Sequence, residues 1–459
     1  SVGLVNGLTA EEFAVASDTM GFEKEIQVAP LSNYLSSRVK REFKEGNTIV
    51  GGMFSLVNRI SADSAILAMK PTSTVSGGVD LLHYWNNKNY YFEVKSIASQ
   101  LQGSPEAMLR KQEEHTHRYQ RPDAGYLAVD SLREQLTGHG GLVQIGKKGG
   151  ILNFNLMGQY RSPGLNLNDM GYMRQADFVG QGAKISYKMN EPGNWIRNYT
   201  IELGQEAQWS FGGENTHNKA GAAFTLMNNK LWRFYVSYHY DFTHLDIREL
   251  RGGPAFRIDG EHQIGAYTTT NGAKDLSGNV GFHYNVYGET GAHQEVFYAG
   301  ITWLPIRKLK LSGKASFNNR KYHQQYVITL QGSDEPLYVV GHIDHRTASF
   351  TFRGELFLTP ELSLQYYGSP YYAVGAYDDF NRVDQSRSKD ISGRLEPLDV
   401  TYNSTENSYS FDHSSETWNF GNPDFSFMQF RSNLVFRWEY KLGSTLYLVW
   451  AHDRSGWES

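Results

Sequence analysis

Residues 426–440, with the sequence Ser-Phe-Met-Gln-Phe-Arg-Ser-Asn-Leu-Val-Phe-Arg-Trp-Glu-Tyr, alternate between two kinds of side chain. The even positions are mostly apolar and end in aromatic residues, whereas the odd positions carry charges and amides. Successive side chains of a β-strand point to opposite faces, so this period of two predicts a strand with one apolar and one polar face. Residues 441–443 then reverse the chain, and residues 444–453 return as a second strand.

The two faces of this strand predict its surroundings. A soluble antiparallel sheet can also be apolar on one face. An apolar face flanked by Tyr and Trp, opposite a polar face, is what a transmembrane β-barrel requires. We therefore expect one set of side chains to face lipid, namely Met428, Phe430, Leu434, Phe436 and Trp438. The other set, Gln429, Arg431, Asn433 and Arg437, should face the lumen.

Composition narrows the function class. The chain has 459 residues, of which 20% are charged and 14% aromatic, and its formal net charge is −4. No run approaches the roughly eighteen apolar residues of a transmembrane helix. The small negative charge offers no basic surplus for phosphate backbones, so nucleic acid is not an expected partner. The absence of cysteine excludes disulfides and thiolate metal sites.

The alternating pattern recurs along the whole chain and is interrupted by turn signals. We count about 19 strands. Every second connection is short, and the connections between them tend to be longer, notably residues 100–139 and 374–422. Short periplasmic turns and long extracellular loops are typical of outer-membrane barrels. The predicted fold class is all-β: a large antiparallel transmembrane β-barrel over residues 1–459, with both long connections outside the cell.

Both ends read as cut. Residues 1–5 begin as if already inside a strand, and residues 454–457 read as the start of a loop. We expect the domain to lack its first few strands and its closing strand, so the intact barrel would have more than about 20 strands.

One segment departs from the β pattern. Ser104-Pro105-Glu106 begins like a helix, with Ser as N-cap, Pro in the first position and Glu in the first turn. The helix can continue to about Tyr119, and Arg121-Pro122 would end it. Because a helix of this length is marginal in water, we expect it to pack into or across the barrel mouth, through Met108, Leu109 and Tyr119.

Several strings resemble one family of Bacteroidota outer-membrane proteins, domain-of-unknown-function family 5916. They are LSNY (31–34), RVKR (38–41), NTIVGGM (47–53), GGVD (77–80), GSPEA (103–107), YQRPDA (119–124), LNDMG (167–171), RSN (431–433), RWEY (437–440), GS (443–444) and VW (449–450). The resemblance covers nearly the whole chain in order. It implies an upstream domain similar to carbohydrate-binding family 9, additional strands and a closing strand, all outside this sequence.

Tyr119, Arg121 and Asp123 form the first candidate site. At a lumen mouth, Arg and Tyr can bind a sugar or a carboxylate. The alternative, which we favour, is that Arg121 and Asp123 anchor the end of the helix to the barrel wall by charge-assisted hydrogen bonds. Further candidates for ligand binding or lumen gating are polar residues on predicted lumen-facing registers: Arg233, His239, Asp241, Arg431 and Arg437.

Catalytic and metal sites have weaker support. His342 and Asp344 share one strand face, as do His239 and Asp241, and a carboxylate beside an imidazole can serve a hydrolase. With 15 His in the chain, such pairs are expected by chance. His115 and His117 point to different helix faces and should be solvent-facing. Asp378, Asp379 and Asp384 could hold calcium, but their spacing is irregular. No catalytic residue, metal or cofactor is predicted.

The predicted function is that of a non-enzymatic outer-membrane barrel. It would take part in the passage or handling of a solute, with a glycan as a candidate, or act as a subunit of a larger outer-membrane assembly. The alternatives are a barrel-embedded hydrolase with a His–carboxylate site and a structural scaffold with a sealed lumen. Expected partners are outer-membrane lipid and lipopolysaccharide, with other outer-membrane proteins or surface lipoproteins as candidates.

Overall fold

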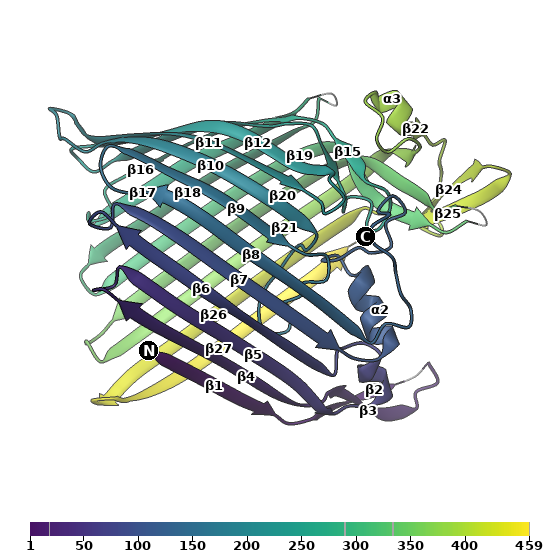
Figure 1. The fold of residues 1–459 in the computed structure, drawn as a ribbon, viewed down its shortest axis with the longest axis horizontal. Coiled ribbons are helices and arrows are strands. Elements are labelled where there is room, and N and C mark those ends of the chain that lie inside the picture. Colours follow the sequence, from purple (N-terminus) through teal and green to yellow (C-terminus); the bar gives the residue numbers. More distant parts are fainter. Residues whose placement is uncertain (18, 289–290, 333–334, 459) are drawn as a thin grey trace. The chain divides into compact units, whose positions relative to one another are not determined.

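The computed structural model describes residues 1–17, 19–288, 291–332 and 335–458 (Figure 1). Twenty strands belong to one large antiparallel sheet. The predicted fold class, a large antiparallel all-β barrel, is thereby confirmed; the described residues contain three short helices where one was predicted. Contacts divide the chain into two compact units. Unit 1 comprises Ser1–Tyr187, Gly204–Lys219 and His244–Ile258, and unit 2 comprises Lys188–Leu203, Ala220–Thr243 and Asp259–Ser459. The prediction of a single domain stays a prediction.

Unit 1 contains a run of antiparallel strands in which each pairs with the next. In spatial order they are β1 (Val2–Thr9), β4 (Leu31–Phe43), β5 (Thr48–Ser61), β6 (Ser73–Trp85), β7 (Tyr90–Gln102), β8 (Gln135–Lys147), β9 (Leu152–Arg161) and β10 (Phe178–Met189). The remaining elements are the hairpin of β2 (Glu12–Ser17) and β3 (Glu23–Ala29), the pair β14 (His244–Asp246) and β15 (Phe256–Ile258), and the helices α1 (Ser64–Leu67) and α2 (Pro105–Glu113). β11 (Ile196–Trp209) and β12 (Asn215–Asn228) contribute residues to both units.

Unit 2 continues the same plan. Its main strands are β13 (Arg233–Asp241), β16 (Glu261–Thr269), β17 (Leu276–Tyr287), β18 (His293–Ile306), β19 (Leu309–Leu330), β20 (Leu337–Phe357), β21 (Leu362–Val383), β26 (Phe425–Lys441) and β27 (Ser444–Glu458), each paired with the next. Between β21 and β26 lie α3 (Ile391–Arg394), β22 (Leu395–Pro397) and a small sheet of β23 (Thr401–Asn403), β24 (Ser408–His413) and β25 (Glu416–Gly421).

Each unit has one apolar and one polar sheet face. In unit 1, the exposed Val50, Leu81 and Val143 lie in one register row on the apolar face. The polar face carries Asp80, whose carboxylate accepts two hydrogen bonds from Arg38 at 2.5 and 2.9 Å, and a Lys95–Glu93 ion pair of 2.8 Å. A two-faced strand follows from period-two patterning, because partners in adjacent strands share a face.

β26 confirms the predicted alternation in unit 2. Leu434 lies opposite Tyr366 and Trp450, and Phe436 lies opposite Leu364 and Leu448, so the apolar face continues across three strands. On the other face, Arg431 pairs with Asp453 at 2.9 Å. That the apolar face contacts lipid stays a prediction.

Several predicted boundaries are wrong. β7 and β8 extend further than expected, so the long connection predicted at 100–139 is residues 103–134. β21 likewise continues to Val383, and the loop predicted at 374–422 contains α3 and the β23–β25 sheet. Residues 454–457 are not a loop but the end of β27. The polar segment after β1 forms the β2–β3 hairpin. In these places pairing with a neighbouring strand outweighs the polar local sequence.

The predicted helix is shorter than expected. α2 begins after Ser104, as predicted, but it ends at Glu113 rather than near Tyr119. The chain leaves the helix because Tyr119 N donates to Gln112 O at 2.9 Å, which folds residues 114–119 back on the last turn. No helix within the described residues is long and apolar enough to cross a membrane.

The two faces of β26 can be tested with a matched pair of substitutions. Leu434→Arg should lower the free energy of unfolding in lipid vesicles by about 2–4 kcal/mol, the cost of a cation on the lipid face near the midplane. Asn433→Arg, on the polar face, should change it little. Urea titrations of the refolded protein would measure both. Equal stability of the two variants would show that both faces are wet, and a less stable Asn433→Arg variant would show that the faces are reversed.

Candidate functional site: a helix–loop layer and a tyrosine–serine row

Three segments of unit 1 form what we call the helix–loop layer: residues 103–134, 162–177 and 244–258. α2 begins the layer at the ends of β7 and β8 (Figure 1). Ser104 Oγ accepts a hydrogen bond from Ala107 N at 3.2 Å and donates one to Leu67 O at 2.9 Å. The N-cap residue therefore satisfies a free helical N–H and also fixes the helix to the end of α1.

The layer covers the polar face of the sheet. Ala107, Met108 and Tyr119 are buried against Leu101 of β7 and Leu136 of β8, which lie opposite each other. Leu101 is an even number of residues from Glu93 and Lys95 on the same strand, so all three share the polar face. Met108 and Tyr119 pack as predicted, whereas Leu109 is only half-buried.

The second segment lies directly on this face. A Cβ added at Gly138 of β8 would lie 1.9 Å from Leu165 N, so only glycine permits the approach. Asp169 accepts hydrogen bonds from Thr74 of β6 and, at 3.1 Å, from Arg59 of β5. Ser99 Oγ of β7 accepts from Asn166 N at 3.0 Å. Residues 162–177 are thus held on the sheet by both backbone contact and polar bonds.

A buried ion pair joins the first two segments. Arg121 donates to Asp177 at 2.6 Å, and both side chains are only 2% exposed. Tyr126 Oη donates to the same carboxylate at 2.6 Å, and Phe211 N donates to its other oxygen at 3.0 Å. Burial and the hydrogen bond to Asp177 raise the pKa of Tyr126. Removing one partner of such a pair costs about 3–5 kcal/mol, because a buried charge is left uncompensated.

The expected anchors are therefore present, but they bind loops. Arg121 was predicted to bond the barrel wall, and it bonds Asp177 in the residues before β10. Asp123 accepts from Ala255 N at 2.8 Å, in the third segment, and Arg118 donates to Arg251 O at 3.0 Å. Loop-to-loop bonds of this kind make the three segments one layer rather than three separate connections.

His117 is buried, so the prediction that it faces solvent is wrong; His115 is exposed as predicted. His117 Nδ1 donates to Pro163 O at 2.7 Å, and Nε2 accepts from Asn166 Nδ2 at 3.0 Å. Asn166 Nδ2 also donates to Glu114 at 2.9 Å. Burial lowers the pKa of His117, since the charged imidazolium would be desolvated.

Unit 2 carries a second polar feature, which we call the tyrosine–serine row. It is a register row in which each residue lies opposite the next, from β13 to β27: Tyr235, Tyr267, Gly281, Tyr298, Ser316, Ser349, Tyr371, Gln429 and Ser455. The rings of Tyr235 and Tyr267 stack at 4.7 Å between centroids. Tyr298 lies over Gly281, where an added Cβ would be 2.4 Å from the phenol oxygen. The row contains aromatic rings, hydroxyls and an amide but no charge.

Two of the predicted site residues lie in the register row next to this one. Arg233 of β13 lies at one end of that adjacent row, and Arg431 of β26 lies near its other end. Arg431 pairs with Asp453 of β27. Arg437 lies further along β26 and pairs with Glu439 at 3.0 Å. His239 and Asp241 lie on the same face of β13, and Asp241 accepts from Gln263 at 3.0 Å. Arg233 and Arg431 therefore border the tyrosine–serine row, and the predicted site residues do not converge on one point.

The predicted His–carboxylate pair has a different partner. Asp344 bonds Arg346 at 2.7 and 3.0 Å, whereas His342 bonds Asp378 of β21 and stacks on His323 with centroids 4.5 Å apart. Asp384 pairs with Arg382 at 3.4 Å. Within the described part of the chain, no group of three or more His, Asp or Glu side chains is arranged to hold a metal ion.

Sequence reasoning missed the partners that complete the layer. Sequence patterns did not single out Asp177, Tyr126 or Asn166. Of the residues that hold the layer on the sheet, Asp169 does lie in a string that carries the family resemblance, LNDMG. Asp177 is 56 residues from Arg121, and no periodicity relates them. A weak signal is available at Asp177: a polar residue directly before an apolar strand, with a positive φ of 56° in the structure.

Comparisons with known proteins place the chain in context. The model of a family described as "Domain of unknown function (DUF5916)" matches residues 1–456. No curated protein matches. Among solved structures, the chain is similar to the FrpB iron transporter from Neisseria meningitidis, with 9% identity, 91% of this chain and 74% of that chain covered, and a TM-score of 0.46. A ferric enterobactin receptor from Pseudomonas aeruginosa has 8% identity, coverage of 96% and 75%, and a TM-score of 0.42. An anion-selective porin from Comamonas acidovorans has 12% identity, coverage of 71% and 91%, and a TM-score of 0.31.

Acidification should loosen the layer at His117. The pKa of a histidine in an unfolded chain is about 6.5. Because the folded pKa is lower, the unfolded segment takes up the proton first, and the stability of the layer falls as the pH drops through that value, by up to about 1.4 kcal/mol per pH unit. The protection factors of residues 114–126, which correct the hydrogen-exchange rates for the intrinsic effect of pH, should fall as the pH is lowered from 7.5 to 5. His117→Gln should remove the pH dependence and His115→Gln should keep it; a flat profile in the parent protein would contradict the assignment.

Proposed function

The chain belongs to the family described as "Domain of unknown function (DUF5916)", and on that premise we propose that it is an outer-membrane β-barrel that passes a neutral, hydroxyl-rich solute. A glycan is the solute class that we favour. One observation carries the proposal. In both units the sheet has an exposed apolar face and carries most of its charges and amides on the other face, which in unit 1 also carries the helix–loop layer.

This division of faces suits a sheet between lipid and water. An exposed apolar face of this size is unfavourable in water, whereas lipid is its natural solvent. The paired charges of Arg38, Asp80, Glu93 and Lys95 would instead be costly in hydrocarbon and are accommodated on a wetted face. The long connections would then lie outside the cell, where protease added to intact cells would cut them before the short turns.

The tyrosine–serine row supports the solute class. Tyrosine rings present flat apolar surface together with a hydroxyl, and Ser and Gln add neutral donors and acceptors. Sugars have both apolar C–H faces and many hydroxyls, so such a row can bind them weakly without a fixed charge. The nearby charges lie in the adjacent register row, on Arg233, Lys314 and the Arg431–Asp453 pair.

The helix–loop layer would restrict passage. A barrel with this many strands is wide enough to leak unless something fills it. The layer is buried and bonded to the polar face, as a stable constriction requires. In this proposal Tyr119, Arg121 and Asp123 act by holding the layer together, because Arg121 is buried and bonded to Asp177 and Tyr126 and is not available to a ligand.

We propose that the protein catalyses no reaction. His342 and Asp378 form a His–carboxylate pair of the kind that suits a hydrolase. Among the described residues, however, no hydroxyl nucleophile is within hydrogen-bond reach of that imidazole.

Deleting residues 106–123 should raise single-channel conductance in planar bilayers, since it removes α2 and Arg121. Asp177→Asn would be added to the deletion, so that no buried charge is left unpaired. Deletion of residues 401–421, which carry the β23–β25 sheet, is the matched control and should leave conductance unchanged. If only the control deletion opens the pore, the constriction belongs to that loop. Vesicle refolding and far-UV circular dichroism would confirm that each variant retains its strands.

Removing rings from the tyrosine–serine row should slow a sugar selectively. Tyr267→Ala and Tyr298→Ala should each reduce liposome swelling with a neutral trisaccharide more than with gluconate, because stacking serves the sugar ring. Tyr366→Ala, on the apolar face, is the control. Equal effects on both solutes would argue that the row has no part in selecting them.

A further inference from the structure

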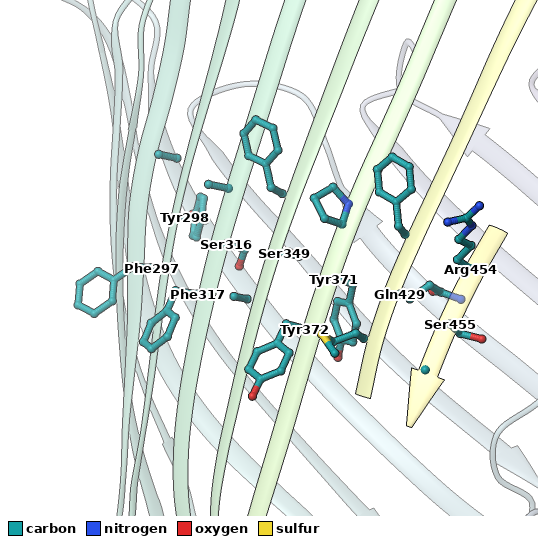
Figure 2. Close-up of a pocket in the computed structure, with 18 of the residues that line it drawn as sticks. Phe297, Tyr298, Ser316, Phe317, Ser349, Tyr371, Tyr372, Gln429, Arg454 and Ser455 are labelled. Carbon is teal, nitrogen blue, oxygen red and sulfur yellow. The ribbon is translucent and has the colours of Figure 1, made fainter. Parts of the chain in front are cut away.

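The apolar face of unit 2 is hollowed by a depression of about 920 Å³ (Figure 2). Its floor consists of small residues on neighbouring strands: Ala299 lies opposite Ala315, and Ala348 lies one register row further along. The row of Ala348 ends at Gly456 on β27, where an added Cβ would meet no atom within 4 Å. Small side chains in consecutive strands thus leave open space.

Aromatic side chains form the rim. Phe297, Phe317, Phe350, Tyr372 and Phe430 line the depression. Figure 2 shows Phe297, Phe317 and Tyr372, which lie in one row on β18, β19 and β21, with Ala348 of β20 between the last two. All five are substantially exposed. A depression of this volume with apolar walls fits a flexible hydrocarbon chain rather than a polar solute.

The depression lies where the apolar face ends. Two residues beyond Phe297 on β18 stands Glu295; two beyond Phe317 on β19 stands Asn319; and two beyond Ala348 on β20 stands Arg346. These positions share a face with the depression because their spacing is two. An occupant would therefore have an apolar part in the depression and a polar part at its edge.

One cation lies among the lining residues. Arg454 of β27 is directly opposite Phe430 on the apolar face. Its Nε donates to His452 Nε2 at 2.8 Å, and His452 in turn stacks on Trp450 at 5.6 Å. No carboxylate pairs with Arg454 in the ranges that the structure describes. Arg on a lipid-facing surface is costly unless an anion accompanies it.

We propose that the depression binds one acyl chain of a phosphorylated lipid and that Arg454 binds its phosphate. Arg is suited to phosphate because its planar guanidinium can donate two parallel hydrogen bonds. The inference rests on the proposed location of the barrel in a membrane, but not on solute passage. An apolar segment of a second copy could also fill the depression, yet it would leave the guanidinium without a counter-charge.

The test uses the full chain in detergent, stripped of lipid and titrated in native mass spectrometry. The probes are dipalmitoyl phosphatidic acid, dipalmitoyl glycerol with the same chains but no phosphate, and inorganic phosphate. Phosphatidic acid should bind more tightly than the other two probes, with one lipid bound per protein. Arg454→Gln should weaken it about 10- to 100-fold, as expected when hydrogen bonds to a charged group are lost. Ala315→Phe should abolish it by filling the floor.

Two controls match these variants in chemistry. Arg41→Gln removes a cation on the apolar face of unit 1, where Arg41 lies over the Phe43 ring, and Val75→Phe adds the same ring to that face. Both should bind lipid like the parent. The proposal would be overturned if dipalmitoyl glycerol bound as well as phosphatidic acid, or if the Arg454→Gln variant bound phosphatidic acid like the parent. It would also be overturned if the parent were a dimer and the Ala315→Phe variant a monomer, because a second copy would then fill the depression. Conductance measured on the same samples separates this outcome from a failure of the proposed function.

Discussion

The structure depends on one constraint: a backbone placed in hydrocarbon must satisfy its N–H and C=O groups internally. Antiparallel pairing along β4 to β10 and along β13 to β27 does this, since every main strand there bonds its neighbour over most of its length. Side chains are then free to differ between the two faces. The apolar face can take lipid as its solvent, and most of the polar side chains are collected on the other face.

The helix–loop layer can form because polar side chains are gathered on one face of the sheet. Loops must satisfy their own backbone groups, and a polar sheet face supplies partners such as Ser99, Thr74 and Arg59. The Arg121–Asp177 pair closes the layer at its most buried point. On the apolar face the unusual features are of the opposite kind: missing side-chain volume and a cation, Arg454, that no carboxylate pairs in the described part of the chain.

The sequence predicted the strands well because their signal is local. The alternation in β26 relates residues only two positions apart, so pattern and structure agree. It failed where pairing, not pattern, decides: in β2 and β3, in the β23–β25 sheet and in the last residues of β27. At the site, Tyr119 and Arg121 could be selected from the sequence. Asp177 and the burial of His117 could not, because both depend on contacts between residues about 50 positions apart in the chain.

The contact between Gly138 and Leu165 restricts how the layer can move. Backbone packed on backbone has no side chain that can change rotamer to let the partner slide. Residues 162–177 should therefore behave as part of the wall on every timescale short of unfolding. Any reversible opening falls to residues 114–134, which join this wall mainly through side chains and by one backbone bond, from Ala176 N to Thr116 O at 3.0 Å. The dynamic unit is consequently a short strap hinged at the end of α2, and the energy of its release includes that bond and the bonds made by Arg121 and His117.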